Sequence, residues 1–297
     1  MSEYIVEIFL VVSGILVGII NTLAGGGAII TMTLFTVLGL PIGVANGTNR
    51  IAVILQNFTA TLTFIRKRML DIKSGLKLAI PAVIGNIAGS LVATKISDTI
   101  FTICMAVVLT VVLLYMIFDQ SHNHPHIHGG RPLIIRWWHY IWFLLLGFYG
   151  GYIYIGLGYV ILAVTIWSMK LDIITANVIK GFIIFLATPF SLIVFIMNDQ
   201  VDYAFGLWHG IGNVIGAAFA SHFAINWGVK FVRWFLQKLE QTKSFALVFC
   251  VDLWLDKNLG IFQIFDVRIS KKFAILFYNG HHAIVCAQKR QKFRFPG

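Results

Sequence analysis

Charged residues are scarce in this chain: Asp, Glu, Lys and Arg make up 12% of its 297 residues, whereas 58% are hydrophobic. A soluble domain carries about 25% charged residues, so the composition argues against a soluble protein. Several apolar runs approach or exceed the roughly 20 residues that cross a bilayer as a helix. The composition therefore predicts an all-α, polytopic membrane protein with the lipid bilayer as its solvent.

Cysteine is also rare, and its three copies, Cys104, Cys250 and Cys286, share no metal-ligand spacing. The sequence lacks an H-E-x-x-H helix, a G-x-S-x-G turn, a P-loop and a carboxylate pair inside an apolar segment. We therefore expect no enzymatic activity, no cofactor and no metal site. The net charge of +11 is interpreted as a topology signal and not as a nucleic-acid footprint, because no nucleic-acid-binding motif accompanies it.

The apolar residues fall into segments with short loops between them. The segments lie at about 4–22, 28–40, 44–65, 74–94 and 99–118, and, after a polar linker at 119–136, at about 137–150, 153–168, 173–197 and 203–226. The segments at 28–40 and 153–168 are short for full spans, which predicts half-helices or one arm of a re-entrant hairpin.

The two halves of the chain repeat. Two offsets, of 131 and 129 residues, bring identical residues of the halves into register. At 131, Ala45-Asn46 falls on Ala176-Asn177, Asp71 on Asp202, Gly75-Leu76 on Gly206-Leu207 and Val83-Ile84-Gly85 on Val214-Ile215-Gly216, while at 129 Gly18 falls on Gly147 and Gly27 on Gly156.

Charge predicts how the halves are oriented. The loop at 66–73 is strongly basic and therefore cytoplasmic, whereas its counterpart at 197–203 contains no Lys or Arg and should lie outside. Equivalent loops on opposite faces predict two inverted-topology repeats with broken or re-entrant helices. The first repeat would cover 4–118, a cytoplasmic, His-containing linker 119–136, and the second repeat 137–236. Asp71 and Asp202 are predicted to cap the helices that follow them.

The glycine run Gly25-Gly26-Gly27 interrupts an apolar stretch. A helix break there would expose a helix N-terminus, whose free N–H groups attract anions, so this run is the leading candidate for a substrate site. The alternative is a tight helix-packing surface of small residues. Arg50 and Lys180, one in each repeat, would suit an anion with two charges, or each could extend to the headgroups. The candidate substrate-binding residues are Asn21, Thr22, Gly25, Gly26, Gly27, Asn46, Thr48, Asn49, Arg50, Asn177 and Lys180.

The linker carries alternating histidines, His122, His124, His126 and His128. Such a tract can bind a transition metal, but histidines in a loop more often have no specific role, and we assign no metal ligands here.

Three motifs occur together in the first half: the run Asn21-Thr22-Leu23-Ala24-Gly25-Gly26-Gly27, Leu38-Gly39-Leu40-Pro41, and Ala45-Asn46-Gly47-Thr48-Asn49. They resemble the TauE/SafE family of sulfite and organosulfur exporters, and 206–233 is similar to the end of that family's second repeat. The resemblance covers about 5–235. It implies a secondary transporter, or permease, of the inner membrane that moves a small anion such as sulfite, a sulfonate or a related sulfur compound by alternating access, coupled to the proton gradient.

The chain departs from the family pattern in two places. The second glycine break is reduced to Gly150-Gly151-Tyr152-Ile153-Tyr154-Ile155-Gly156, and the final span expected at about 230–249 is too charged to cross readily. We hypothesise that the atypical polar tail at 237–297 is a frameshift product, with a genuine cytosolic appendage as the alternative. Other functions left open are a channel-like anion pore, a membrane-embedded enzyme, an assembly factor, and a non-transporting protein inactivated by this tail. The substrate, its direction, the coupling ion and the oligomeric state, including a homo-oligomer, also stay open.

Overall fold

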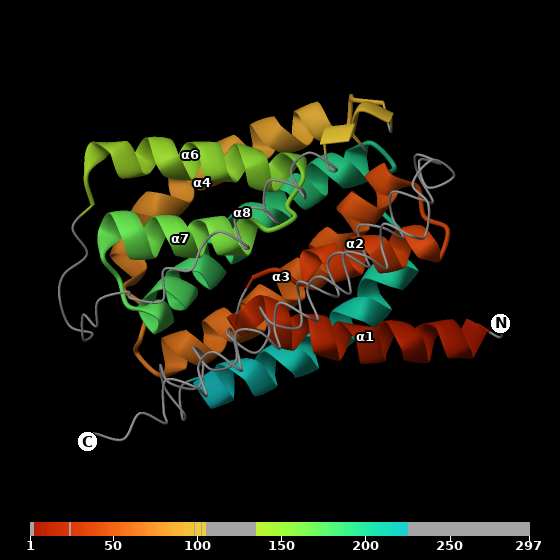
Figure 1. The fold of residues 1–297 in the computed structure, drawn as a ribbon, viewed down its shortest axis with the longest axis horizontal. Helices are drawn as coiled ribbons and strands as arrows, with labels where there is room; N and C mark the ends of the chain where they lie inside the picture. Colours follow the sequence, from red (N-terminus) through yellow and green to blue (C-terminus); the bar gives the residue numbers. More distant parts are fainter. Residues whose placement is uncertain (1–2, 24, 98, 102, 105–134, 225–297) are drawn as a thin grey trace, which may run out of the picture. The chain divides into compact units, whose positions relative to one another are not determined.

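The structure, a computed structural model, describes residues 3–23, 25–97, 99–101, 103–104 and 135–224. These residues form α-helices joined by short turns, with no strand among them (Figure 1). Contacts divide the chain into two units, Met1–Val251 and Asp252–Gly297, and all described residues belong to the first. Most of the predicted 99–118 segment, nearly all of the His-containing linker and the whole predicted tail lie outside the described residues.

The helices follow the predicted apolar segments closely. In the first half, α1 spans Glu3–Leu23, α2 Ala28–Val37, α3 Ile42–Arg66 and α4 Ile72–Ala93. In the second half, α6 spans Trp137–Tyr152, α7 Leu157–Met169 and α8 Ile173–Met197, and a further helix covers 203–224. The predicted short helices are confirmed: α2 has 10 residues and α7 has 13, against about 20 for a full crossing.

Aspartates begin three of the long helices. Asp71 precedes α4 and accepts a hydrogen bond from the Ser74 N–H at 3.3 Å, while Asp172 accepts from two N–H groups in the first turn of α8, both at 3.0 Å. Asp202 accepts from the Phe205 N–H at 3.0 Å. The Ser74 hydroxyl also donates to the Asp71 carboxylate, which lowers the pKa of Asp71. The predicted capping role of Asp71 and Asp202 is confirmed.

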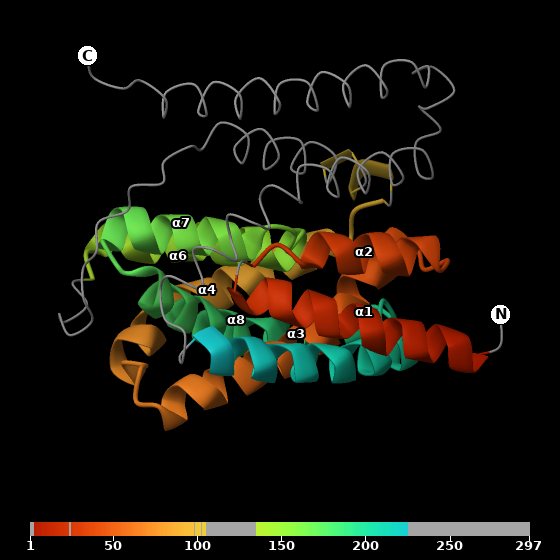
Figure 2. The ribbon, with the colours of Figure 1, turned by 60° about the horizontal axis from the view of Figure 1, so that its bottom comes forward.

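Two close helix crossings flank a central pair, α3 and α8 (Figures 1 and 2). Glycines let both crossings form, because a Cβ atom at these positions would overlap the backbone of the facing helix. A Cβ at Gly85 would lie 2.7 Å from the Phe148 nitrogen, and one at Gly212 would lie 2.8 Å from the Ile15 nitrogen. The glycines are Gly85 and Gly89 of α4 against Gly147 and Gly151 of α6, and Gly14 and Gly18 of α1 against Gly212 and Gly216.

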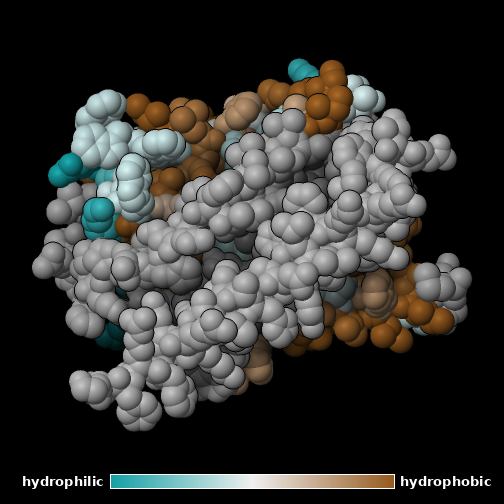
Figure 3. Space-filling view, in the orientation of Figure 1, coloured by the Kyte–Doolittle hydropathy of each residue, from teal (hydrophilic) through white to brown (hydrophobic). Residues whose placement is uncertain are grey.

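Large apolar side chains cover the outer faces of the long helices. They recur about one turn apart: Ile72, Leu76, Ile80 and Ile84 on α4, and Leu207, Ile211, Ile215 and Phe219 on the helix at 203–224. Figure 3 shows hydrophobic surface along the uncovered edges of one view. Within the described residues, Tyr4–Leu23, Ile72–Ala93 and Ile173–Met197 are each long and apolar enough to cross a membrane. Such exposed apolar rows suit contact with lipid, as in a multi-pass membrane protein.

Candidate functional site

The first helix break lies between α1 and α2. Gly25 has a φ of +91°, which residues with a Cβ atom rarely adopt. The Asn21 side chain closes the break: its Oδ1 accepts from the Gly27 N–H at 2.6 Å, and its Nδ2 donates to Gln56 Oε1 of α3 at 3.3 Å. Backbone groups at membrane depth need partners within the protein, and Asn21 provides one at the start of α2.

The second helix break lies between α6 and α7. Tyr154 and Gly156 both have left-handed backbones, with φ of 68° and 71°. The Tyr149 hydroxyl donates to the Ile155 carbonyl and closes this turn. The helix therefore breaks without three consecutive glycines, and a buried tyrosine takes the strained position that glycine takes in the first half.

The two breaks touch each other. A Cβ atom at Gly25 would lie 2.6 Å from Gly158 Cα, and one at Gly158 would lie 2.5 Å from Gly25 Cα. The short helices α2 and α7 begin beside this contact, and both lie on the same side of α3 and α8 (Figure 2). Because the beginning of a helix carries a partial positive charge, two positive helix ends come together here.

A buried lysine holds the end of α1. Lys180 of α8 is 2% exposed, and its ammonium group donates to the carbonyls of Asn21 at 3.1 Å and Thr22 at 3.2 Å and to Asn177 Oδ1 at 2.7 Å. Asn177 Nδ2 in turn donates to the Leu23 carbonyl at 3.3 Å. An ammonium group has three N–H donors, so these acceptors use all of them. We name this arrangement, Lys180 with Asn177, the α1 clamp.

A buried arginine holds the end of α6 in the same way. Arg50 of α3 is fully buried; its Nη1 donates to the Gly150 carbonyl at 2.6 Å, and its Nη2 donates to the Gly151 carbonyl at 3.0 Å and to Asn46 Oδ1 at 3.1 Å. Asn46 Nδ2 donates to the Tyr152 carbonyl at 3.0 Å. We name Arg50 with Asn46 the α6 clamp.

The two clamps correspond through the two sequence offsets. The offset of 129 residues carries the three carbonyls held by the α1 clamp, those of Asn21, Thr22 and Leu23, onto those held by the α6 clamp, of Gly150, Gly151 and Tyr152. The offset of 131 carries Asn46 onto Asn177, although the two cations differ by one position, since Lys180 falls opposite Asn49. Each cation lies about one turn after its asparagine.

The clamps change the charge of both breaks. The C-terminal end of a helix carries about half a negative charge, and its last carbonyls lack partners within the helix. Each clamp adds a full positive charge at such an end, and no Asp or Glu is buried among the described residues. The balance at the breaks is therefore positive, which favours an anion beside the beginnings of α2 and α7. Both cations are buried, so neither extends to the headgroups.

The polar groups of Thr22, Asn49 and Thr48 differ in their hydrogen bonding. The Thr22 hydroxyl and the Asn49 amide nitrogen are buried without a hydrogen-bond partner in the described part of the chain. Thr48 lies elsewhere, because its hydroxyl accepts from the Asp202 N–H at 2.8 Å and ties α3 to the loop before 203–224. The structure thus brings Asn21, Thr22, Gly25, Gly26, Gly27, Asn177 and Lys180 to the first break and Asn46 and Arg50 to the second.

Three residues at or near the breaks were not predicted. The Tyr154 ring lies 4.9 Å from the Arg50 guanidinium carbon, and Gly158 forms the contact with Gly25. His209, fully buried, lies 3.0 Å from Thr31 of α2. The offset of 129, which places Gly27 on Gly156, could have directed attention to Tyr154 and Gly158. A single histidine in an apolar helix gives no such signal.

The TauE/SafE sulfite exporter family model matches residues 10–237 of the chain. The chain belongs to this family. The resemblance seen in the motifs around the glycine run is confirmed, and the family match together with the apolar helices makes this TauE/SafE chain a multi-pass membrane protein of a transporter family.

Curated proteins that are similar to this TauE/SafE chain carry transporter names. "Probable membrane transporter protein ORF9" of a Sinorhizobium species is 25% identical over 226 residues, which cover 76% of this chain and 85% of that protein. "Probable membrane transporter protein" of Haemophilus influenzae is 24% identical over 227 residues, 74% of this chain and 86% of that protein. "Probable membrane transporter protein YfcA" of Escherichia coli K12 is 24% identical over 225 residues, 73% and 80%. No solved structure matches the chain.

Proposed function

We propose that this protein is a secondary transporter that moves a small anion across the inner membrane by alternating access. The observation that carries the proposal is the contact between Gly25 and Gly158, which joins two helix breaks of net positive charge. Interrupted helices that meet inside the membrane are typical of transporter binding sites. The family and the names of the relatives favour transport over catalysis.

The proposal includes two repeats of opposite topology, 4–118 and 137–236. The packing supports it: α1 crosses the helix at 203–224 and α6 crosses α4, so the first helix of each half packs on the last long described helix of the other. Gly75 abuts Phe182 and Gly206 abuts Ile51, two contacts that the offset of 131 residues exchanges. Alternating access would then be a rocking of the two halves about the breaks.

We propose that the anion binds at the beginnings of α2 and α7, beside the glycine run Gly25, Gly26 and Gly27. The clamps would set the shape and the charge of this site, and Thr22 and Asn49 would offer it polar atoms. Thr48 would hold α3 in place. The family description, sulfite exporter, supports sulfite as the substrate. We propose sulfite, a sulfonate or a related sulfur compound, with transport coupled to the proton gradient. No cofactor or nucleic acid has a part in this proposal.

The first test is counterflow of labelled sulfite in proteoliposomes, with taurine, sulfoacetate, thiosulfate and sulfate as competitors. A carrier should show saturable uptake that one competitor blocks. Flux that rises linearly with concentration would instead support the channel-like alternative, and no uptake of sulfite or any competitor would contradict the proposed function.

We also propose that the tail at 237–297, which lies outside the described residues, replaces a final span through a frameshift. The support is that the family match ends at residue 237, next to a stretch too charged to cross readily. Translation of the other reading frames of the gene past codon 235 tests this: an apolar span there supports the frameshift, and its absence in both frames would overturn it.

A further inference from the structure

His209 connects the helix at 203–224 to both α1 and α2. Its Nδ1 lies 3.1 Å from the Leu10 carbonyl oxygen, and its Nε2 lies 3.0 Å from the Thr31 hydroxyl. A carbonyl oxygen can only accept, so Nδ1 carries the hydrogen of the neutral imidazole. Nε2 is then the acceptor, and the Thr31 hydroxyl donates to it.

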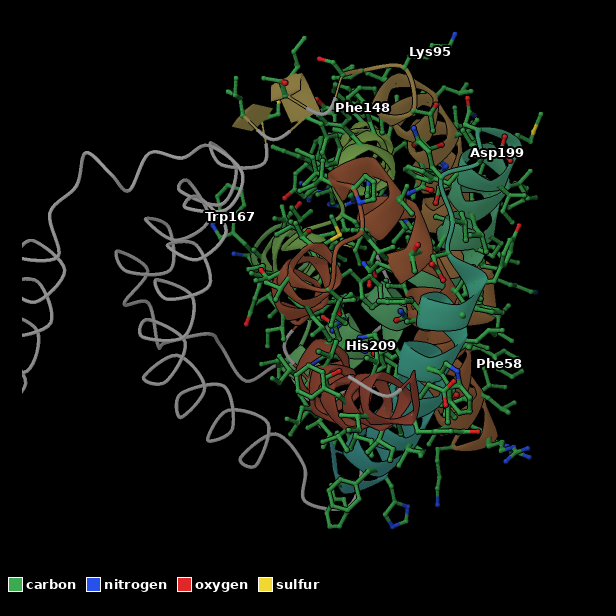
Figure 4. The ribbon with its side chains drawn as sticks, turned by 90° about the vertical axis from the view of Figure 1, so that its right-hand side faces the viewer. Phe58, Lys95, Phe148, Trp167, Asp199 and His209 are labelled. Carbon is green, nitrogen blue, oxygen red and sulfur yellow. The ribbon has the colours of Figure 1, made fainter. Side chains whose placement is uncertain are left out.

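The surroundings of His209 contain no compensating charge. The Ser13 hydroxyl lies 3.4 Å from Nδ1, and the Phe35 ring stands edge-on with its centroid 5.3 Å from that of the imidazole. No charged side chain of the described residues contacts the ring, and α2 contains no ionisable residue. The charged residue nearest along α1 is Glu7, one turn before Leu10 and half-buried. Figure 4 shows His209 in the interior, whereas Lys95 and Asp199 lie at the periphery.

A proton on His209 would oppose this packing. It would convert Nε2 from an acceptor into a donor, so the Thr31 hydroxyl would have to turn its own hydrogen away. It would also place a positive charge in an apolar interior without a partner, which is costly. Protonation therefore favours an arrangement in which the imidazole reaches water. Thr31 follows Gly27 by one turn, so the helix that His209 releases is the one that begins at the first break.

The other buried ionisable groups of the described residues are engaged differently. Arg50 stays charged at any physiological pH, and all three donors of Lys180 are used by the α1 clamp. His139 is bonded to Ser168 and to the Arg136 N–H at the start of α6, away from either break. His139 therefore contacts α7 near its C-terminal end, whereas His209 contacts α2 through Thr31, one turn from the first break.

We propose that His209 binds the proton that couples the proton gradient to movement of α2 at the first break. This inference rests on the proposed function, since it assigns the coupling group of the proposed carrier. Protonation would release the Thr31 contact and open the site, and loss of the proton would allow α2 to pack again on 203–224.

The first experiment measures this movement without any substrate. Spin labels are attached to cysteines at Val37 of α2 and Leu207, which are 50% and 51% exposed, in the full chain in nanodiscs with Cys104, Cys250 and Cys286 replaced by serine. Between about pH 8 and about pH 5, the distance distribution should shift in this background and stay constant with His209→Gln, because glutamine cannot titrate. Thr31→Val removes the hydroxyl through which His209 contacts α2, so it should reduce the shift. His139→Gln should leave the shift unchanged.

An unchanged distribution in the unmodified His209 background, or an equal shift with His209→Gln, would overturn the proposal. A second experiment relates the group to transport by comparing labelled sulfite uptake with and without a pH gradient, in both gradient directions. The ratio of sulfite uptake with the gradient to uptake without it should fall from about tenfold to about one with His209→Gln. It should stay at about tenfold with His139→Gln. If sulfite is not carried at all, the proposed function fails while the spin-label result still decides the role of His209.

Discussion

Lys180 is buried within a membrane helix, where an isolated charge is costly. Its position is tolerated because three acceptors meet its three donors, and because two of them are carbonyls at the negative end of α1. Arg50 has more donors than its clamp uses, and its Nε is buried without a partner among the described residues. An anion could therefore approach Arg50 without breaking the α6 clamp, whereas contact with Lys180 would break the α1 clamp.

The first prediction concerns these cations. We expect Arg50→Gln and Lys180→Gln each to abolish anion binding without abolishing membrane insertion, because each removes a buried positive charge from a break. Lys180→Gln should also leave carbonyls of α1 unpaired, at a cost of about 1–3 kcal/mol and a fall of several degrees in Tm. Equilibrium binding of labelled sulfite and thermal unfolding of the purified protein measure the two effects.

Lys77→Gln is the matched control, since Lys77 is an exposed lysine on α4. It should leave both the affinity and the Tm unchanged. Near-normal sulfite binding by both buried-cation variants would show that the positive charges of the clamps do not contribute to anion binding.

At the scale of elements, the breaks join because both sides lack side chains at the contact. Gly25 needs glycine twice, for its positive φ and for its approach to Gly158. Gly158 needs it for the approach alone, since it lies in the first turn of α7. The clamps therefore fix the ends of α1 and α6, and the lack of Cβ atoms at Gly25 and Gly158 lets the two breaks come into contact.

We accordingly expect Gly158→Ala and Gly25→Ala to separate α2 from α7. Each should lower the Tm and reduce sulfite counterflow, with the larger effect for Gly25→Ala because the left-handed conformation adds about 1–2 kcal/mol. Gly181→Ala is the control: its Cβ would meet only two side-chain atoms of α3, Asn57 Oδ1 at 3.6 Å and Thr61 Oγ1 at 3.8 Å, both ordinary van der Waals contacts. Alanine there should raise stability by up to about 1 kcal/mol. Equal Tm values for all three variants would contradict the described contact.

In the whole molecule, each of the two helix crossings and each of the two clamps joins one half of the chain to the other. If the halves are inverted, the loop between α3 and α4 and the loop between α8 and 203–224 lie on opposite sides of the membrane. The basic residues of the first loop favour the cytoplasm, and the second loop has none.

The third prediction tests this topology with single cysteines in a background in which the three native cysteines are serine. Asn198→Cys should react with an impermeant maleimide added to intact cells. Lys67→Cys should react only in inverted vesicles. Both positions are exposed, so labelling reports the side of the membrane and not burial. Reaction of both from the same side would refute the inverted repeats.

Many features of the fold could be predicted from local sequence. Asp71 and Asp202 were identified as helix caps because a short acidic side chain before an apolar run has few other roles. The half-helix α2 was predicted from its length and the glycines before it. The function of Arg50 could not be predicted in the same way, since its acceptors, Gly150 and Gly151, lie about 100 residues away in sequence.

Local patterns of residues were enough to predict the class of the protein, the positions of its helices, the two breaks and the correspondence between its halves. This was possible because a bilayer requires long apolar helices and allows interruptions only at specific places. Both requirements leave local patterns along the sequence. The packed helices were needed to show which carbonyls the buried cations hold, that the breaks meet at Gly25 and Gly158, and that His209 contacts Thr31. The physical reason is that these contacts join distant segments, and their hydrogen-bond geometry exists only once the helices have packed.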